Sequence, residues 1–374
     1  MIYFDNAATS FPKIQEAYKA AYSAMTEYGA NPGRSGHSLS IRAARAVMSC
    51  REELAQHLKI SEPMRIAFTY SATDALNTAI MGLLNRGERV IAGPYEHNAV
   101  MRPLKELEKE GQIELTVLKT TDSEEIRSAV KPNTTLGVFS HASNVTGEIT
   151  DLMRVSRVLG EYGIPLLADC AQTAGVLDIS PQATGAKLIA MPGHKGLQGL
   201  HGTGALYIAE GYELRPLRYG GTGSLSESMY QPTEMPDALE SGTQNLVGLA
   251  ALCEGVKFVG GHIDEIREYE GFLTDNLREM LAELSGIRVL RTGSSEYVGV
   301  TAFTIDGCTS GEAADFLSEN GICVRGGLHC APSIHSILGT LSTGAVRVSV
   351  GLFNTLDEIK ALVSALQRLL KSLR

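Results

Sequence analysis

Between about residues 40 and 250, short apolar runs alternate with longer segments that have helical patterning. The runs RIAFTY, RVIAGP, TLGVFSH, PLLADC and KLIAM lie at 65–70, 89–94, 135–141, 165–170 and 187–191. Continuous apolar runs of this length are typical of strands buried on both faces of a parallel sheet. One intervening segment, 151–163, begins with an acid and ends with glycine, as a crossover helix should. The alternation therefore predicts an α/β fold.

The chain also contains a second, smaller pattern. Its 374 residues exceed what one hydrophobic core usually supports. After residue 260, a polar helical segment is followed by a strand-like run at 299–305 and by another helical segment at 311–320. The last segment, 354–374, has a capping-box pattern at Thr355 and Glu358 and one apolar stripe. We predict a large domain at 15–255 and a small α+β domain at 256–374, with residues 1–14 packing near the active site.

Composition and charge limit the classes of molecule that the protein is expected to bind. The formal net charge is −9 and no segment is polybasic, so the sequence predicts no binding to nucleic acid or to an anionic membrane. The N-terminus lacks a basic start followed by an apolar run, and no window resembles a membrane span, so we expect a cytoplasmic protein. Six cysteines are scattered without a Cys-x-x-Cys pair, which predicts neither a disulfide framework nor a metal site.

Functional groups follow each of the predicted strands. In an open parallel sheet, ligands bind beyond the carboxyl ends of the strands, so a site would form at these positions. Taken alone, each residue has an ordinary explanation, such as helix capping, a solvated charge or a structural histidine. The residues concerned are Ser71, Thr73, His97, Asn144, Asp169, Gln172, His194 and Lys195.

Together these residues supply what pyridoxal phosphate requires. The cofactor needs a lysine for a Schiff base, a carboxylate that keeps its pyridine nitrogen protonated, a flat side chain over its ring and a helix N-terminus for its phosphate. Lys195, Asp169, His97 and the turn from Ser71 to Thr73 can provide these four groups. The sequence has no G-x-x-x-x-G-K-[ST] loop, and GGTGSLS at 220–226 only partly imitates a dinucleotide loop.

The stretch RGGLHCAPSI, at 325–334, places Cys330 beside His329 in a glycine-rich bend. Taken alone, Cys330 is interpreted as a buried apolar residue, since unpaired cysteines are among the most buried side chains. The predicted cofactor site favours another interpretation, in which the glycines act as hinges and Cys330 is an exposed nucleophile. Neighbouring side chains of an extended segment point to opposite sides, so His329 need not face Cys330. His335 or nearby arginines can stabilise the thiolate instead.

Over essentially its whole length, the sequence resembles the cysteine desulfurases, which are class V pyridoxal-phosphate enzymes of fold type I. The blocks that carry the resemblance occur in the family's order: YFDNAATS, SATDALN, EHNA, SNVTGE, ADCAQ, GHKG, ESGTQN and RGGLHCA. The short segment around Cys330 is similar to the branch with a compact cysteine loop, close to the selenocysteine lyases. The resemblance implies a mainly parallel seven-stranded sheet flanked by helices, a smaller α+β domain, and pyridoxal 5'-phosphate as the cofactor.

The resemblance also implies roles for individual positions. Lys195 looks like the Schiff-base lysine, Asp169 like the partner of the pyridine nitrogen, and His97 like the ring-stacking acid and base. Thr243 would complete the phosphate cup of a neighbouring subunit, which implies a homodimer. The other implied cofactor contacts are Ala72, Thr73, Asn144, Gln172 and His194. The implied substrate contacts are Asn6, Ala7, Ala8, Arg34, Asn144, Arg325 and Arg347, the last gripping the substrate carboxylate.

Position 192 departs from the family's pattern. Similar enzymes commonly have serine or threonine two residues before the histidine of the His-Lys pair, whereas this chain has Pro192. Proline offers no side-chain or backbone hydrogen-bond donor. We therefore expect one contact to the cofactor phosphate to be missing and cofactor retention to be slightly weaker.

The implied reaction converts L-cysteine to L-alanine and leaves the sulfur on Cys330 as a persulfide, which a protein acceptor can then take. The nearest alternative is a related enzyme of the same fold, such as a selenocysteine lyase, a transaminase, another lyase or an epimerase. An alternative of a different class is a structural or metal-binding protein that uses Cys323, His329, Cys330 and His335. The spacing disfavours it, because a second tight ligand pair is missing.

Overall fold

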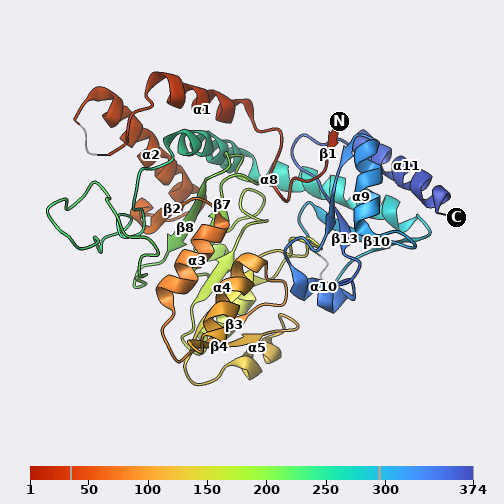
Figure 1. Ribbon diagram of the computed structural model, residues 1–374, viewed down its shortest axis with the longest axis horizontal. Helices are drawn as coiled ribbons and strands as arrows, with labels where there is room; N and C mark the ends of the chain where they lie inside the picture. The colour runs from red at the N-terminus through yellow and green to blue at the C-terminus, as the bar shows by residue number, and fades with distance from the viewer. Residues whose placement is uncertain (34–35, 294–295, 374) are drawn as a thin grey trace.

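The computed structural model describes residues 1–33, 36–293 and 296–373, which form a large unit and a smaller one (Figure 1). The strands of the large unit are β2 (Ile66–Thr69), β3 (Glu88–Ala92), β4 (Ile113–Val117), β5 (Thr134–Ser140), β6 (Leu166–Asp169), β7 (Leu188–Pro192) and β8 (Gly204–Ile208). Its helices are α1 (Gln15–Glu27), α2 (Ser38–His57), α3 (Ala72–Leu83), α4 (Asn98–Lys109), α5 (Ser123–Ala129), α6 (Leu152–Gly160), α7 (Pro181–Thr184) and the first part of α8 (Leu246–Ala282).

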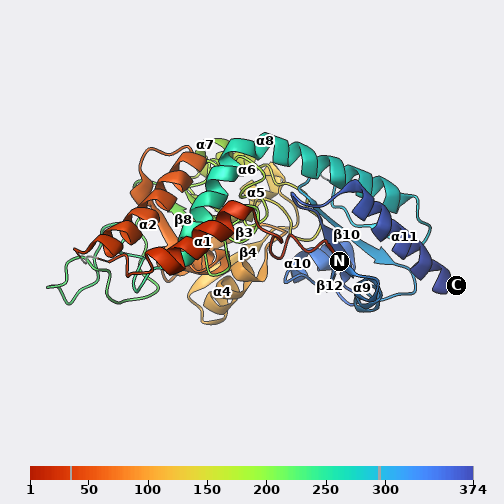
Figure 2. The ribbon, with the colours of Figure 1, turned by 90° about the horizontal axis from the view of Figure 1, so that it is seen from above.

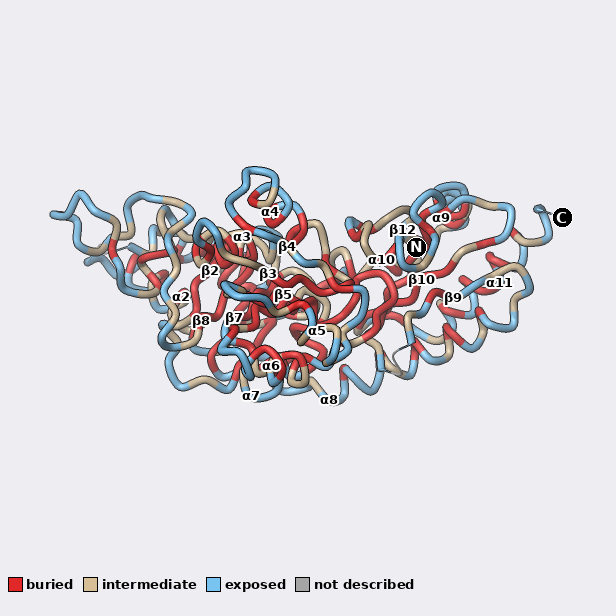
Figure 3. Tube along the Cα trace, turned by 90° about the horizontal axis from the view of Figure 1, so that it is seen from below, coloured by how far each residue is buried: buried red, intermediate tan, exposed pale blue. Residues whose placement is uncertain are grey.

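The seven strands of the large unit form one sheet in the order β2-β8-β7-β6-β5-β3-β4. All pairs are parallel except the two that involve β8. Apolar side chains of α3 and α4 cover one face of the sheet, and those of α2, α5, α6 and α8 cover the other. Every residue of β2, β6, β7 and β8 is buried, and Figure 3 shows this buried centre between exposed outer helices. The mainly parallel seven-stranded sheet is therefore confirmed.

The five strands predicted from the sequence are all present, with ends shifted by one or two residues. Two further strands of this sheet, β4 and β8, were not predicted from the sequence. β4 is an edge strand in which exposed residues alternate with buried or half-buried ones, so it has no continuous apolar run. β8 follows a glycine-rich turn and runs antiparallel to its neighbours, so it falls outside the alternation of strand and crossover helix.

The smaller unit is built on a four-stranded antiparallel sheet in the order β12-β13-β10-β9. Its strands are β9 (Ile287–Val289), β10 (Val300–Ile305), β12 (Arg325–Gly327) and β13 (Ala345–Ser349), and its helices are α9 (Ser310–Glu319), α10 (Pro332–Leu338) and α11 (Leu356–Ser372). The N-terminal strand β1 (Ile2–Tyr3) pairs with β11 (Ile322–Cys323), so residues at both ends of the chain belong to this unit. The predicted capping box at Thr355 and Glu358 is confirmed at the start of α11.

Helix α8 joins the two units and lies along both of them (Figure 2). Its backbone is non-helical at His262, where the helix kinks. Because α8 passes through residue 255, the predicted domain boundary falls inside a helix and stays a prediction. Contrary to the expectation that no window resembles a membrane span, α8 is long and apolar enough to cross one by composition alone. However, 56% of its most apolar window is buried inside the chain, as in a core helix.

Candidate active site

A cavity lies at the carboxyl ends of β5, β6 and β7, beside the first turns of α3 and α4. Residues from widely separated segments meet there because the ends of parallel strands share one edge of the sheet. Eight cofactor-contact residues predicted from the sequence line this cavity: Ala72, Thr73, His97, Asn144, Asp169, Gln172, His194 and Lys195. Ser71 and Ser140 complete the polar part of its wall, and Pro192 also lines it.

Lys195 follows β7 and extends into this cavity, where it is half-buried. Burial and the positive charge of Arg347 lower the pKa of Lys195 to about 8, although the carboxylate of Asp169 acts in the opposite direction. A lysine with such a pKa is in the free amine form in about one molecule in ten at pH 7, far more often than an ordinary lysine. It is therefore suited to nucleophilic attack on a carbonyl and to taking up a proton.

Asp169 ends β6 and is 5% exposed. Burial raises its pKa, while the hydrogen bond from the N–H of Ala171 to Oδ1, 2.9 Å long, acts against this rise. Among the described residues, the N–H of Ala171 is the only hydrogen-bond donor to the carboxylate of Asp169. A buried carboxylate with spare acceptor capacity requires a cationic or N–H partner, and a protonated pyridine nitrogen is such a partner.

His97 is the N-cap of α4, and its Nδ1 accepts a hydrogen bond of 3.0 Å from the N–H of Ala99. Burial, followed by the charges of Lys195 and Arg347, lowers the pKa of His97 to about 4. The imidazole is therefore neutral at pH 7, with its proton on Nε2. A neutral flat ring held at a helix N-terminus suits stacking on an aromatic ligand.

His194 and the first turn of α3 form the end of the cavity that can hold an anion. The N-cap Ser71 accepts the N–H of Asp74, and the N–H groups of Ala72 and Thr73 have no intrahelical acceptor. Burial, followed by the charge of Lys195, lowers the pKa of His194 to about 3, so its ring is neutral. Its buried Nδ1 has no hydrogen-bond partner among the described residues. These free donors match the needs of a phosphate group.

The predicted substrate arginine, Arg347, lies in β13 and is 2% exposed. Its Nη2 forms an ion pair of 2.8 Å with Oδ1 of Asp5, and its Nη1 donates to the backbone oxygen of Asn144 at 3.1 Å. The sequence analysis did not identify Asp5 as its partner. Arg325 lies opposite Arg347 in the neighbouring edge strand and is exposed. A substrate carboxylate would therefore share Arg347 with Asp5.

Asn6 and Ala7 line a second, smaller hollow that also reaches Gln172 and Lys195. The Nε2 of Gln172 donates to the backbone oxygen of Ala7 at 3.2 Å, which ties the N-terminal turn to the cavity wall. The next residue, Ala8, closes this turn by donating its N–H to the oxygen of Asp5. The N-terminal turn therefore lies beside Lys195.

The hollow behind Lys195 also contains Glu270 of α8, a buried acid that the sequence analysis missed. Burial raises the pKa of Glu270 to about 8, from an ordinary value of 4.5. The folded chain thus binds this proton more tightly than the unfolded chain. This contribution to stability is complete below pH 4.5 and is lost as the pH rises towards 8.

Glu270→Gln is therefore expected to stabilise the chain more at about pH 8 than at about pH 5, because the neutral amide removes the cost of ionising this group. Urea unfolding at several pH values measures the difference in free energy of unfolding from the unaltered chain. Glu268→Gln, on the exposed side of the same helix, is the matched control. A Glu270→Gln difference that stays constant over this pH range would contradict the expectation.

One predicted cofactor contact, Thr243, does not line the cavity within this chain. Thr243 is exposed in the segment before α8, where its neighbours Ser241 and Gln244 line a different hollow. Arg34 lies outside the described residues. The contact of Thr243 with the cofactor of another subunit stays a prediction.

Cys330 lies in the bend between β12 and α10 and is exposed. The side chain of His329 points away into the small unit, where its Nε2 lies 3.0 Å from the oxygen of Ala345. Gly326 and Gly327 belong to β12, and a Cβ on Gly326 would lie 2.4 Å from the oxygen of Ser310. Gly326 is therefore closely packed, whereas Gly327 has a φ of 115° and open space where a Cβ would lie, so the hinge role expected for these glycines stays a prediction.

The backbone beside Cys330 contacts the cavity wall directly. The Nδ2 of Asn144 donates to the oxygen of His329 at 2.7 Å, and the N–H of Asn98 donates to the oxygen of Cys330 at 2.7 Å. His335, the other histidine considered for thiolate stabilisation, is buried, with its Nδ1 2.8 Å from Oγ1 of Thr340. Neither histidine is therefore placed as a base for Cys330.

Sequence reasoning also missed the acid next to His97. Glu96 is 1% exposed and accepts hydrogen bonds from the N–H of Ser140, at 2.7 Å, and from its hydroxyl, at 2.9 Å. Burial raises the pKa of Glu96 to about 8. A Cβ on Gly93 would lie 2.6 Å from Oε1 of Glu96, so this glycine makes room for the acid. The signal in the sequence was an acid between two apolar segments, next to a predicted site histidine.

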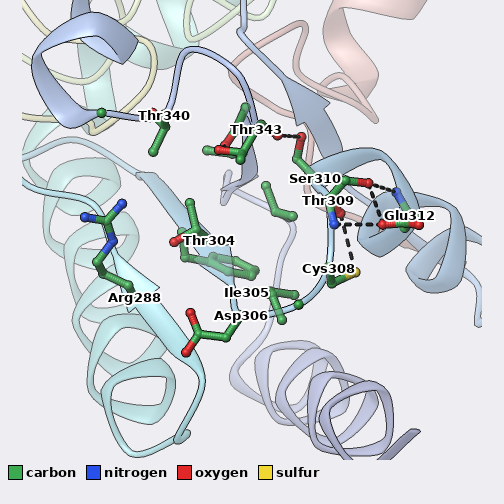
Figure 4. A pocket seen from close by; sticks show the side chains of 16 residues that line it. Arg288, Thr304, Ile305, Asp306, Cys308, Thr309, Ser310, Glu312, Thr340 and Thr343 are labelled. Carbon is green, nitrogen blue, oxygen red and sulfur yellow. Dashed lines mark hydrogen bonds between the residues drawn. The ribbon is translucent and has the colours of Figure 1, made fainter. Parts of the chain in front are cut away.

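A wider hollow of about 500 Å³ lies in the small unit, apart from these residues (Figure 4). Arg288, Thr304, Asp306 and Cys308 lie around it, with Thr340 and Thr343 on the opposite side. None of the predicted site residues lines it. The chemistry-bearing residues therefore gather in the narrower cavity at the edge of the large sheet.

Comparisons with known proteins agree with this geometry. A probable cysteine desulfurase of Methanothermobacter thermautotrophicus is 32% identical to this chain over 381 residues, covering 98% of this chain and 94% of that protein. A probable cysteine desulfurase of Pyrococcus abyssi is 31% identical, covering 100% and 95%. The apo structure of a cysteine desulfurase from Thermococcus onnurineus superposes with a TM-score of 0.93 at 28% identity, covering 99% of this chain and 95% of that one.

A family-wide comparison covers almost the whole chain. The model of the aminotransferase class-V family matches residues 2–362, a range that includes both units and every predicted site residue. The solved structure of cysteine desulfurase CsdA (S-sulfonic acid) from Escherichia coli has a TM-score of 0.90 at 26% identity, covering 100% of this chain and 95% of that one. On its sequence, its fold and the residues gathered at its sheet edge, this chain belongs to the aminotransferase class-V family.

Proposed function

We propose that this chain is a pyridoxal-phosphate-dependent cysteine desulfurase, which converts L-cysteine to L-alanine and retains the sulfur on Cys330 as a persulfide. One observation carries the proposal. Asn144, which lines the cavity that contains Lys195, Asp169 and His97, donates a hydrogen bond to the backbone that presents Cys330. The cysteine desulfurases among the relatives support the same assignment.

Pyridoxal 5'-phosphate matches the chemistry of the cavity. Lys195 would hold it covalently, Asp169 would accept a hydrogen bond from its protonated ring nitrogen, and His97 would cover its ring. The first turn of α3 and His194 offer the free donors that its phosphate requires. When bound, the cofactor withdraws electrons from the α-carbon of an amino acid and so makes its C–H bond acidic.

The remaining chemistry belongs to residues of this chain. Lys195, with a pKa lowered to about 8, accepts the α-proton of the substrate and later returns a proton. The thiolate of Cys330 attacks the substrate sulfur, so that an S–S bond forms while the Cβ–S bond of the substrate breaks. The electron pair of the broken bond stays with the carbon fragment, which takes up a proton and leaves as alanine. The overall reaction of a thiol and L-cysteine to a persulfide and L-alanine is balanced without an added oxidant.

The test supplies L-cysteine, L-selenocysteine and L-cysteine sulfinate separately to the cofactor-loaded protein. Alanine from L-cysteine, together with a mass increase of one sulfur atom on the peptide that contains Cys330, is expected. Alanine from L-selenocysteine alone would favour a selenocysteine lyase. A keto acid as the product would favour a transaminase, and no reaction with any of the three would refute the proposal.

We further propose a homodimer in which Thr243 reaches the cofactor phosphate of the other subunit. Thr243 is exposed and follows a segment with exposed apolar side chains, among them Tyr219, Met229 and Tyr230. Exposed apolar side chains of this kind are typical of protein interfaces. Light scattering of the purified protein tests the dimer. A protein acceptor for the sulfur and a cytoplasmic location are further parts of this proposal.

Pro192→Ser is expected to strengthen cofactor binding by up to about tenfold, since one added donor to a phosphate contributes roughly 1.4 kcal/mol. Pro192 lines the cavity at the end of β7, next to the phosphate end. Titration of the cofactor-free protein with pyridoxal phosphate measures the dissociation constant. Pro192→Ala, which adds the N–H but no hydroxyl, separates the two donors, and equal affinity of Pro192→Ser and the unaltered chain would refute the missing contact.

A further inference from the structure

The bend that presents Cys330 is attached to the large unit at two consecutive carbonyl groups. The N–H of Asn98 donates to the oxygen of Cys330, and the Nδ2 of Asn144 donates to the oxygen of His329, both at 2.7 Å. Asn98 is the first residue of α4 and follows His97 directly. The two donors therefore come from the segments that also carry the cavity wall.

The backbone of this bend is strained. His329 and Cys330 have φ values of 51° and 56°, in the left-handed region that residues other than glycine rarely adopt. Such a conformation is unfavourable in residues other than glycine and persists only where surrounding contacts impose it. The bonds from Asn98 and Asn144 are contacts of this kind. Without them, the bend would be free to relax into an ordinary backbone conformation.

Asn144 connects this bend to the charged part of the site. Its backbone oxygen accepts a hydrogen bond from Arg347, and its Oδ1, which is buried and lines the cavity wall, has no partner among the described residues. Arg347 lies within electrostatic range of Cys330. Asn144 thus holds Cys330 near a positive charge while keeping an acceptor available to a ligand.

We propose that the backbone N–H of Asn98 and the side-chain amide of Asn144 form a latch that positions Cys330 at the cavity. Both are positioning residues, because they act on the reaction through the place of Cys330. The inference rests on the proposed function for its role in desulfuration, whereas the latch itself is testable on the protein without cofactor.

Asn98→Pro tests the latch with little disturbance of the helix. Proline at the first helical position is favoured, because the N–H of that position has no intrahelical partner. The preceding residue, His97, has φ −71° and ψ 156°, which a following proline accepts. The substitution removes the N–H that binds the oxygen of Cys330. Asn98→Ala is the matched control, since it removes the side chain and keeps the N–H.

The first readout is the rate at which iodoacetamide alkylates Cys330 in the cofactor-free protein, followed on its peptide by mass spectrometry. Cys330 is already exposed, so its alkylation rate depends on the surroundings in which the bend places the thiol rather than on access. The alkylation rate near neutral pH is expected to differ by at least about threefold between Asn98→Pro and Asn98→Ala, because only Asn98→Pro releases the bend from the N–H that binds the oxygen of Cys330. Equal rates in these two variants would overturn the latch.

The second readout uses the cofactor-loaded enzyme with L-cysteine. kcat is expected to be roughly tenfold lower in Asn98→Pro than in Asn98→Ala, with a similar KM, because a misplaced nucleophile slows the chemical step without weakening substrate binding. Equal kcat values, or a loss confined to KM, would contradict the positioning role. If the unaltered chain forms no alanine, the proposed function fails, and the alkylation rates still decide on the latch.

Asn144→Ser provides an independent variant if Asn98→Pro does not fold. Serine is too short to reach the oxygen of His329, so the alkylation rate of Cys330 in the cofactor-free protein is expected to change in the same direction as in Asn98→Pro. An alkylation rate in Asn144→Ser equal to that of the unaltered chain would overturn the contribution of the side-chain amide.

Discussion

Cys330→Ala is expected to lower alanine formation from L-cysteine by more than about a thousandfold, the scale seen when a covalent nucleophile is removed. Without the thiol, the substrate sulfur has no acceptor on the chain. The cofactor is expected to stay bound with unchanged absorbance, because Cys330 is not among the residues that line the cavity. Alanine formation, cofactor absorbance and the mass of the chain after one turnover measure these outcomes.

Cys308→Ala is the matched control for this experiment. Cys308 is a half-buried cysteine of the same unit that lines the wider hollow away from the cofactor cavity. Its substitution is expected to leave persulfide formation on Cys330 intact. Persulfide formation in the Cys330→Ala chain would show that another thiol carries the sulfur. Continued release of selenide from L-selenocysteine by Cys330→Ala would instead support the selenocysteine lyase alternative.

Lys195→Ala is expected to abolish fixation of the cofactor by borohydride and to slow exchange of the substrate α-proton by roughly 10²–10⁴-fold. The reason is that Lys195 is the amine of the cavity and the group placed to take up that proton. Mass spectrometry after borohydride treatment measures the first effect, and proton exchange in deuterated water measures the second. Lys187→Ala, at an exposed position just before β7, is the matched control.

The lowered pKa of Lys195 predicts how the rate of cofactor binding depends on pH. Only the deprotonated amine attacks an aldehyde, so binding of pyridoxal phosphate to the cofactor-free protein should accelerate as the pH rises through about 8. An ordinary lysine would require a pH above about 10 for the same effect. A midpoint near that higher value would contradict the shift attributed to burial and to Arg347.

The sheet was predictable because its strands are buried on both faces. The apolar runs that become β2, β3, β5, β6 and β7 are visible without any tertiary information. The half-exposed edge strand β4 lacks that signal, because solvent covers part of it and polar residues are tolerated there. The sequence thus predicted the strands in which burial on both faces requires apolar residues. It did not predict strands in which the residue types depend on the position of the strand in the sheet.

The candidate site was also predictable only in part. Lys195, Asp169 and His97 follow predicted strands, and the topology of a parallel sheet brings such positions to one edge. The pairing of Asp5 with Arg347 joins residues 342 positions apart, and no local pattern indicates it. The same is true of the N–H of Asn98, a backbone group whose acceptor lies in the small unit.

The sequence by itself determined the fold class, the cavity edge and the types of residue that line it, because periodicity and strand ends are local properties of the chain. Only the tertiary structure decided how Cys330 is held. Its left-handed backbone, the burial of His329 and the two hydrogen bonds from the large unit depend on how the two units pack. Strain and interdomain hydrogen bonds are relations between distant segments, so they exist only once the chain is folded.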